Sequence, residues 1–256
     1  MCSSDLILKR FQMEDYRPIA TPMITNWKKI DTSEDDEVDP TLYRQLIGSL
    51  MYLVNTRPDI CYAVNTLSNF MVEPRRAHWA AAKHVLRYLK GTVEFGLKYT
   101  KGNEIQLSGF TDADSDGSPV DWKSTNGYCF SLKSGMTSWC SRKQKSVALS
   151  STKVEYMVAS TTSCEAIWIR KLLMNLFKKR MEPTRILCDN QSCIKLSENH
   201  VFHDLSKHID IRCHFIRNYV QKGAVQLQYT PTGEQVADIL TKALSKIKFT
   251  YFRAMF

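Results

Sequence analysis

Four acidic side chains stand where their carboxylates could act together: Asp112, Glu155, Asp189 and Asp238. The residue patterns predict that the first and third end strands, whereas the second and fourth lie near the starts of helices. In an open α/β sheet, groups at the carboxyl ends of strands meet in one crevice. Carboxylates so close repel one another unless a cation neutralises them, and oxygen-only ligands favour Mg²⁺ or Mn²⁺. The four acids therefore predict a site for two divalent ions that could hold a phosphodiester.

Each acid also has a purely structural explanation. Thr152 followed by Glu155 fits a capping box at the start of a helix. Asp189 fits an N-cap, and Asp112 fits a turn residue. Asp238 fits a carboxylate that favours the amino end of a helix dipole. Their order along the chain, alternating between strand ends and helix starts, is more specific than any one of them.

The composition indicates a folded chain with a polyanionic partner. Hydrophobic residues make up 43% of the 256 residues, which is enough for a core, and the formal charge is +9. Residues 104–256 carry 21 basic and 14 acidic side chains against 14 and 12 in residues 1–103. Most of the positive field thus belongs to the second part, and we expect nucleic acid to bind there.

Several classes of protein are not expected. The sequence has no apolar run long enough to span a bilayer, and its start, MCSSDLILKRF, lacks the apolar segment of a signal peptide. The eight cysteines include no CxxC pair, so a zinc site or disulfide scaffold is not indicated. We expect a cytoplasmic or nuclear protein with reduced thiols.

Three regions follow from the patterns along the chain. Residues 1–39 resemble a tail that ends in an acidic linker, and residues 40–92 predict three amphipathic helices. Residues 93–256 alternate strands and helices. The strands are expected at 105–112, 127–132, 136–142, 185–188 and 225–229, and the helices at 151–177, 190–197, 209–220 and 234–244.

Motifs in order along nearly the whole chain carry a family resemblance. They include YRQLIGSLMYLVNTRPDICYAVNTLSNFM, GFTDADSDG, ALSSTKVEYMVAS, ILCDNQSCIKLSEN and EQVADILTKAL. Together they resemble the carboxyl-terminal part of a copia-type retrotransposon Pol polyprotein. The resemblance implies an α/β fold, an RNase H-like five-stranded mixed sheet flanked by helices. A small three-helix segment like the reverse transcriptase thumb and connection would precede it.

The resemblance also implies roles for particular residues. The family's metal-binding acids correspond to Asp112, Glu155, Asp189 and Asp238, with Asp114 as a competitor for the first position. Gln191 matches a glutamine that contacts the hybrid in its minor groove. Apart from the resemblance, basic residues near the proposed site could hold phosphates or belong to a solvated face, namely Lys123, Arg142, Lys143 and Lys145.

Some positions depart from the family pattern. Lys153 stands where the family usually has an acid, and Thr230–Gly233 contains no histidine to assist product release. The Tyr-x-Asp-Asp motif of the polymerase is absent, and the only Asp-Asp pair, Asp35-Asp36, lies in the acidic linker. We therefore expect no polymerase centre in this chain.

The expected function is metal-dependent cleavage of the RNA strand in RNA–DNA hybrids, with two Mg²⁺ ions, or Mn²⁺ in their place, as cofactor. Expected partners are the hybrid and the remainder of Pol, including the reverse transcriptase palm, and no membrane. Without that palm, the helical segment would expose apolar surface and could self-associate. The alternative is a catalytically inactive remnant of a retrotransposon that at most binds nucleic acid, and a third reading is another nuclease of the RNase H superfamily.

Overall fold

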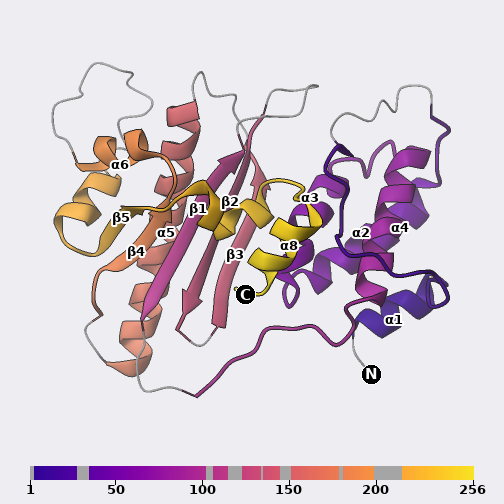
Figure 1. Ribbon diagram of the computed structural model, residues 1–256, viewed down its shortest axis with the longest axis horizontal. Helices are drawn as coiled ribbons and strands as arrows, with labels where there is room; N and C mark the ends of the chain where they lie inside the picture. The colour runs from indigo at the N-terminus through magenta and orange to yellow at the C-terminus, as the bar shows by residue number, and fades with distance from the viewer. Residues whose placement is uncertain are drawn as a thin grey trace. The chain divides into compact units, whose positions relative to one another are not determined.

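The computed structural model describes residues 3–27, 35–101, 106–114, 123–133, 135–144, 151–178, 181–198 and 215–256. The chain divides into two compact units (Figure 1). Unit 1 comprises Met1–Leu97 together with Lys242–Phe256, and unit 2 comprises Lys98–Thr241. This division differs from the regions expected from sequence, because the last fifteen residues join the helical unit and the amino-terminal residues are part of it.

Unit 1 is helical. Its α-helices are α1 (Ser3–Arg10), α2 (Pro40–Leu53), α3 (Cys61–Ser68), α4 (Arg76–Lys90) and α8 (Lys246–Arg253), with a 3₁₀ turn η2 at Pro58–Ile60. Pro40 stands in the first turn of α2, where a missing N–H costs nothing, and the Asp39 carboxylate caps that helix by accepting from the Thr41 N–H at 2.8 Å. Apolar residues at helical spacing fill the core: Leu46, Leu50, Leu67, Leu86 and Leu89 are buried. The three helices expected in residues 40–92 are present.

Two further helices belong to unit 1 although they were not expected. In the presumed tail, α1 buries Ile7 and Leu8. At the other end of the chain, α8 buries Phe249 and Phe252, which are three residues apart on one helix face. The Phe249 ring packs edge-on against the ring of Tyr88 with centroids 5.6 Å apart. Burial of these apolar side chains in unit 1 explains why short segments with weak helical signals are ordered.

A buried ion pair lies at the centre of unit 1. The Arg57 guanidinium donates to both carboxylate oxygens of Asp59, at 2.9 and 2.8 Å. It also donates to the Thr92 carbonyl at 2.9 Å and to the Thr92 hydroxyl at 2.7 Å. The Tyr88 hydroxyl donates to Asp59 at 2.5 Å. Every charged group of this network therefore has a partner inside the unit.

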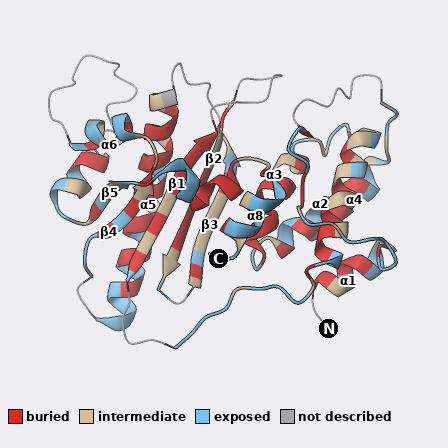
Figure 2. Ribbon diagram, in the orientation of Figure 1, coloured by how far each residue is buried: buried red, intermediate tan, exposed pale blue. Residues whose placement is uncertain are grey.

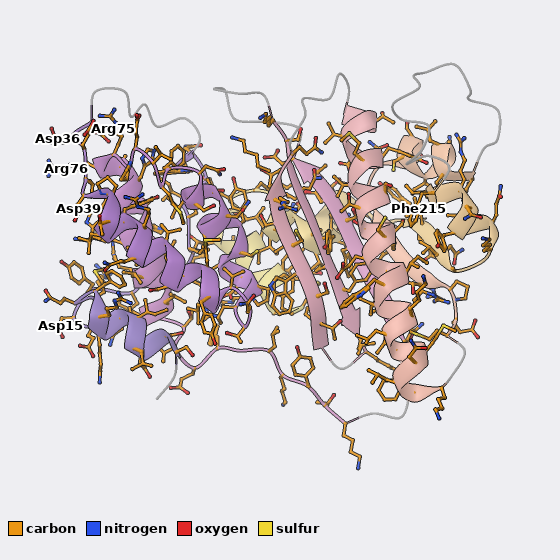
Figure 3. The ribbon with its side chains drawn as sticks, turned by 180° about the vertical axis from the view of Figure 1, so that it is seen from behind. Asp15, Asp36, Asp39, Arg75, Arg76 and Phe215 are labelled. Atoms are coloured by element: carbon orange, nitrogen blue, oxygen red, sulfur yellow. The ribbon has the colours of Figure 1, made fainter. Side chains whose placement is uncertain are left out.

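The acidic stretch before α2 is more than a linker in its described part. The Asp35 carboxylate accepts from the Ala77 N–H at 2.9 Å, in the first turn of α4. Figure 3 labels Asp36 beside Arg75 and Arg76, and the Arg76 guanidinium lies 3.7 Å from the Asp36 carboxylate. Acidic groups here favour the amino end of the α4 dipole. The side chains remain solvated, but the backbone is held against α4.

Unit 2 contains one five-stranded sheet with the order β3-β2-β1-β4-β5. The central strand pairs antiparallel with β2 and parallel with β4, and β3 and β5 form the antiparallel and parallel edges. The strands are β1 (Leu107–Asp114), β2 (Thr125–Leu132), β3 (Gly135–Lys143), β4 (Thr184–Cys188) and β5 (Val225–Tyr229). This mixed topology confirms the expected RNase H-like fold.

The helix α5 (Ser151–Phe177) has the bounds expected from sequence and packs against β1. Figure 2 shows buried residues along α5 and along the strands of the sheet. Most of them form an apolar core, which includes Tyr156, Ala159, Ala166, Ile186 and Leu227, and a smaller cluster consists of Ala113, Val154 and Val158. The helix α6 (Gln191–Glu198) and the helical residues 215–221 follow in the chain.

The last part of unit 2 corrects one expectation. A single helix was expected over residues 234–244, but the chain forms two 3₁₀ segments, η3 (Thr232–Glu234) and η4 (Val236–Leu240). The Gln235 side chain, which accepts from the Ala237 N–H at 3.3 Å, caps η4. All five residues of η4 are buried, so tertiary packing rather than helix propensity sets the conformation. Within the described residues, no helix is both long enough and apolar enough to span a bilayer.

Candidate active site

Two parallel strands bring the first and third acids side by side. In the pairing of β1 with β4, Ser108 lies opposite Arg185 and Phe110 lies opposite Leu187. Two residues further along each strand, the same register sets Asp112 level with Asp189. The carboxyl ends of these strands thus meet at one edge of the sheet, as expected from sequence.

Asp112 is 2% exposed, and a residue distant in the sequence bonds to its carboxylate. Its Oδ2 accepts a hydrogen bond from the Thr241 hydroxyl. Asp114, the competitor for the first position, is also buried at the end of β1. The charge of Asp112 is one of the causes that raise the pKa of Glu155, whereas Asp114 is not among those causes. This favours Asp112 as the first acid of the site.

Glu155 projects from the first turns of α5 and is 7% exposed. Burial, followed by the charges of Asp112, Cys188 and Asp189, raises its pKa from the ordinary 4.5 to about 10, and a hydrogen bond with the Ala113 backbone opposes the shift. Among the described residues, its buried Oε2 accepts no hydrogen bond.

The capping explanations for two of the acids do not match the geometry. Because α5 begins at Ser151, Thr152 lies within the helix and does not form the capping box with Glu155. At α6, the cap is formed by Asn190, whose Oδ1 accepts from the Cys193 N–H at 2.9 Å. The carboxylates of Glu155 and Asp189 are therefore left for another role.

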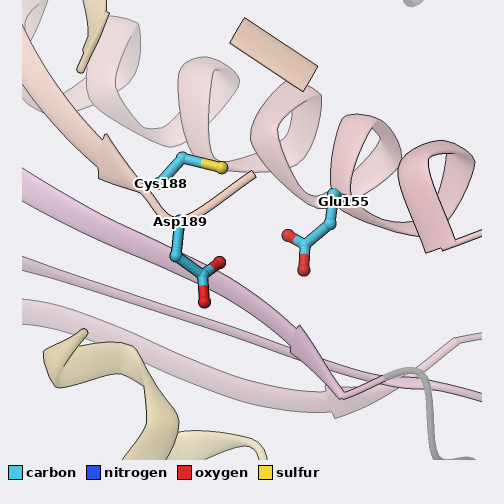
Figure 4. A group of neighbouring side chains, drawn as sticks. All are labelled: Glu155, Cys188 and Asp189. Carbon is cyan, nitrogen blue, oxygen red and sulfur yellow. The ribbon is translucent and has the colours of Figure 1, made fainter. Parts of the chain in front are cut away.

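Asp189 directly follows β4 and is half-buried. Its Oδ2 accepts from the Thr232 hydroxyl at 3.0 Å. Figure 4 shows the Asp189 and Glu155 carboxylates facing the same space, with the Cys188 thiol beside them. One ligand atom from each of these three residues lies within 4.8 Å of the other two.

Asp238 lies in η4 and is fully buried. The segment η4 packs against β1 and β2. The Thr241 hydroxyl, which donates to Asp112, also donates to the Asp238 carbonyl at 3.2 Å. The backbone of the fourth acid is thus tied to the first, although neither Asp112 nor Asp238 belongs to the close group formed by Glu155, Cys188 and Asp189 in the described chain.

The residues expected to contact substrate differ in their position relative to this edge of the sheet and in their exposure. Gln191 is the exposed first residue of α6, two positions after Asp189. Lys143 ends β3 and lies opposite Thr125, which in turn lies opposite Asp114 on β1. Lys123 lies two residues before the start of β2 and is half-buried. Lys145 lies outside the described residues.

Three contributors to the site were missed by sequence reasoning: Cys188, Gln235 and Thr241. Gln235 is fully buried, and its Nε2 donates to the Thr111 carbonyl at 3.0 Å and to the Leu187 carbonyl at 3.5 Å. These partners precede the two strand-end acids. The signal available in the sequence was the place of Gln235 in the motif EQVADILTKAL, three residues before Asp238.

The donor set fits divalent cations. Carboxylate oxygens predominate, and one buried oxygen of Glu155 accepts no hydrogen bond in the described part of the chain. A cation would offset the burial and the repulsion that together raise the Glu155 pKa. Buried carboxylates at the carboxyl edge of an RNase H-like sheet define the chain as an RNase H-like domain with a candidate metal centre.

Comparison with known proteins shows the family. The chain is 46% identical over 246 residues to a retrovirus-related Pol polyprotein from the Arabidopsis thaliana transposon RE2, covering 96% of this chain and 17% of that protein. It is 39% identical over 250 residues to the Pol polyprotein of a Nicotiana tabacum transposon, covering 95% of this chain and 19% of that protein. The chain belongs to the retrovirus-related Pol polyproteins of copia-type transposons and matches their carboxyl-terminal part.

The chain therefore spans about a sixth of the length of these curated relatives. No protein-family model matches the sequence. Among solved structures, the amino-terminal RNase H domain of a Mycobacterium tuberculosis protein is similar, with a TM-score of 0.40 and 10% identity, over 59% of this chain and 98% of that one.

Proposed function

We propose that this chain is the ribonuclease H of a retrotransposon Pol polyprotein and hydrolyses the RNA strand of RNA–DNA hybrids with divalent metal ions. The observation that carries the proposal is the approach of the Glu155 and Asp189 carboxylates to within 4.8 Å, with a buried Glu155 oxygen that accepts no hydrogen bond among the described residues. The register of β1 with β4 sets Asp112 level with Asp189. A buried pair of acids of this kind is costly unless a cation joins it.

Asp112, Glu155, Asp189 and Asp238 would hold two Mg²⁺ ions, or Mn²⁺ in their place. Such ions lower the pKa of a bound water and stabilise the leaving oxygen of a phosphodiester. In the metal-free protein, a Glu155 pKa of about 10 keeps this side chain protonated at neutral pH. Glu155 would release that proton to solvent as it becomes a ligand. Thr241 and Thr232 would hold the Asp112 and Asp189 carboxylates in place through their hydroxyl groups.

The hybrid would lie along the edge where β1 and β4 end. Gln191, exposed at the start of α6, would contact the minor groove, and Lys123, Lys143 and Lys145 would contact phosphates. Discrimination of RNA from DNA would come from 2′-hydroxyl contacts on a surface that reads the shape of the helix. The cut would leave 3′-hydroxyl and 5′-phosphate ends.

In this proposal, the helices of residues 40–92 correspond to the thumb and connection of a reverse transcriptase, whose palm lies elsewhere in Pol. Unit 1 exposes large apolar side chains, including Tyr52 and Val72, which are 75% and 81% exposed. Such residues are candidates for contact with the remainder of Pol, or with a second copy when that remainder is missing. Light scattering of the isolated chain distinguishes a monomer from a self-associating protein.

The test is cleavage of an end-labelled RNA–DNA hybrid with and without Mg²⁺. We expect the wild-type chain to shorten the RNA strand only when Mg²⁺ is present, and Asp189→Asn to remove this activity while the circular dichroism spectrum is unchanged. Asp36→Asn is the matched control, because the Asp36 side chain is 83% exposed in unit 1. Cleavage by Asp189→Asn at the wild-type rate would refute the site. No cleavage by the wild type would favour the inactive remnant.

A further inference from the structure

We propose that Cys188 is a third protein ligand at this site, so that the site also takes a thiophilic divalent cation such as Cd²⁺, Zn²⁺ or Co²⁺, an inference that rests on the proposed function. The expected set of ligands consisted of oxygens alone. A sulfur in the set changes the choice of ion, because thiolates prefer softer metals than Mg²⁺.

The position of the thiol carries the first part of this inference. Cys188 is the last residue of β4, and its Sγ lies within 4.8 Å of one carboxylate oxygen each of Glu155 and Asp189. The thiol is directed toward the same space as the two carboxylates (Figure 4). Three such groups, with a fourth position open to water or substrate, make up the ligand number of catalytic zinc sites.

The Glu155 carboxylate supplies an independent observation. Glu155 is 93% buried, and its Oε2 accepts no hydrogen bond from the described residues. A buried acceptor of this kind costs stability unless a donor or a cation satisfies it. Cys188 and Glu155 would satisfy this need together by binding one ion.

A second buried cysteine shows that this setting is not general. Cys129 on β2 is fully buried, and burial raises the pKa of its thiol. Cys188 is also fully buried, but its Sγ lies within 4.8 Å of carboxylate oxygens of Glu155 and Asp189. The Asn190 N–H also donates to the Cys188 Sγ at 3.5 Å. The thiolate is the form that binds metal, so the thiol proton goes to solvent when the ion arrives.

The experiment is a titration of the full chain with Cd²⁺, followed by the sulfur-to-cadmium charge-transfer absorption in the ultraviolet. Relative to the wild type, Cys188→Ser should lose the tightest phase of this absorption, and its Cd²⁺ affinity should fall by about tenfold or more. Cys129→Ser is the matched control and should keep that phase. An unchanged tight phase in Cys188→Ser would overturn the proposal.

A second measurement covers the case in which Cys188→Ser does not fold. The ¹¹³Cd resonance of the wild-type protein should show the downfield shift of a sulfur ligand, and a shift typical of oxygen ligands alone would also overturn the proposal. Hybrid cleavage with Mg²⁺ is measured on the same wild-type sample. A Cys188-dependent Cd²⁺ site without cleavage would contradict the proposed function only, and cleavage without that site would contradict the ligand only.

A different observation independently identifies Gln235 as a positioning residue. The side-chain amide of this fully buried residue bonds to three backbone groups: the carbonyls of Thr111 on β1 and Leu187 on β4, and the N–H of Ala237 in η4. One amide group thus connects the three segments that carry Asp112, Asp189 and Asp238. We infer that Gln235 sets the spacing of these three acids.

The test of Gln235 is the Mg²⁺ dependence of cleavage. Gln235→Met preserves the length of the side chain and removes its hydrogen bonds, and it should raise the Mg²⁺ concentration for half-maximal cleavage about tenfold, the loss typical of groups that orient ligands. Excess Mg²⁺ should restore much of kcat, which a merely destabilised protein would not show. Gln226→Met, on the exposed face of β5, is the control. An unchanged Mg²⁺ dependence would contradict the inference.

Discussion

Each unit of the molecule buries acidic side chains, and the two units compensate for that burial in opposite ways. In unit 1, the Asp59 carboxylate receives two bonds from the Arg57 guanidinium and one from the Tyr88 hydroxyl. In unit 2, burial, followed by the charges of neighbouring groups that include Asp112 and Asp189, raises the pKa of Glu155 to about 10. One buried acid is neutralised by its own chain, and the other retains a proton.

Under the proposed function, this difference separates a structural acid from a metal-binding one. A buried ion pair whose groups are all hydrogen-bonded stabilises one arrangement of the helices, and its charged groups are already occupied by partners in the protein. Carboxylates that raise the pKa of a neighbour are arranged for a charge that arrives from outside. Burial alone would not have distinguished Asp59 from Glu155, since both are less than 10% exposed.

The largest expected effect is on catalysis in unit 2. Glu155→Gln keeps the shape of the side chain and removes its charge, so hybrid cleavage should fall by about a thousandfold or more, as for loss of a group that stabilises the transition state. Without metal, the same variant should be at least as stable as the wild type, because glutamine is neutral and folding then no longer requires a carboxylate to take up a proton. Cleavage assays and urea unfolding test both statements, and a large loss of metal-free stability would place Glu155 with Asp59 as a structural acid.

The next largest effect is on stability in unit 1. Arg57→Met leaves Asp59 buried without its guanidinium, and the free energy of unfolding should fall by about 3–5 kcal/mol. Urea unfolding followed by circular dichroism measures the change. Arg44→Met on the exposed side of α2 is the control, since its guanidinium bonds only to a backbone carbonyl of its own helix in the described contacts. A decrease below about 1 kcal/mol, typical of an exposed pair, would remove the contrast between the units.

The pH dependence of stability should follow the Glu155 pKa. This pKa is raised from 4.5 to about 10 in the folded state, so between these values the folded protein retains a proton that the unfolded chain has lost. Without metal, stability should therefore decrease as pH rises through this window, by at most about 1.4 kcal/mol per pH unit from this group. Mg²⁺ should oppose the decrease because it displaces the proton.

Thermal unfolding at pH 6 and pH 8, with EDTA or with Mg²⁺, measures this linkage. In Glu155→Gln the metal-free difference between the two pH values should shrink. A wild-type protein that becomes more stable toward pH 8 without metal would contradict the assignment of the retained proton to Glu155.

The smallest effect is expected for the basic residues. Lys143→Ala should raise KM for the hybrid a few-fold and reduce the slope of log affinity against log salt by about one, as for loss of one phosphate contact. Lys133, in the turn that follows β2 at the far end of the sheet, is the control. Equal effects of the two alanine variants would indicate general attraction to the positive chain instead of a phosphate contact at the site.

Much of the fold could be predicted because its signals are local. The 27 residues of α5 repeat their apolar positions often enough to define both ends, and the turn between β2 and β3 was located from the Ser134-Gly135 pair. The short helices α1 and α8 could not be predicted, because only packing within unit 1 stabilises segments of eight residues. The region of η4 was expected to be a helix because VADIL has helical spacing and its tertiary contacts are invisible in the sequence.

The candidate site divides in the same way. Acid types and their order along the chain indicated Asp112 and Asp189 at neighbouring strand ends. The register of β1 and β4 sets the two acids level, although β1 continues for two residues past Asp112 to Asp114. The contributions of Cys188, Gln235 and Thr241 could not be predicted, because each depends on which distant group faces the side chain. A buried thiol and two neutral polar residues have no periodicity that reveals such partners.

The two bonds that close the site join residues far apart in the sequence: Gln235 reaches Thr111 across 124 positions, and Thr241 reaches Asp112 across 129. During translation, the growing chain cannot make either bond until the ribosome has released nearly all of unit 2. Contacts of such long range form late and slowly in folding. A copy of the gene that loses the codons for Gln235 to Thr241 would thus yield a sheet without these two bonds, however well the earlier codons are preserved. Asp112 and the end of β1 would then lack the partners that hold them in place.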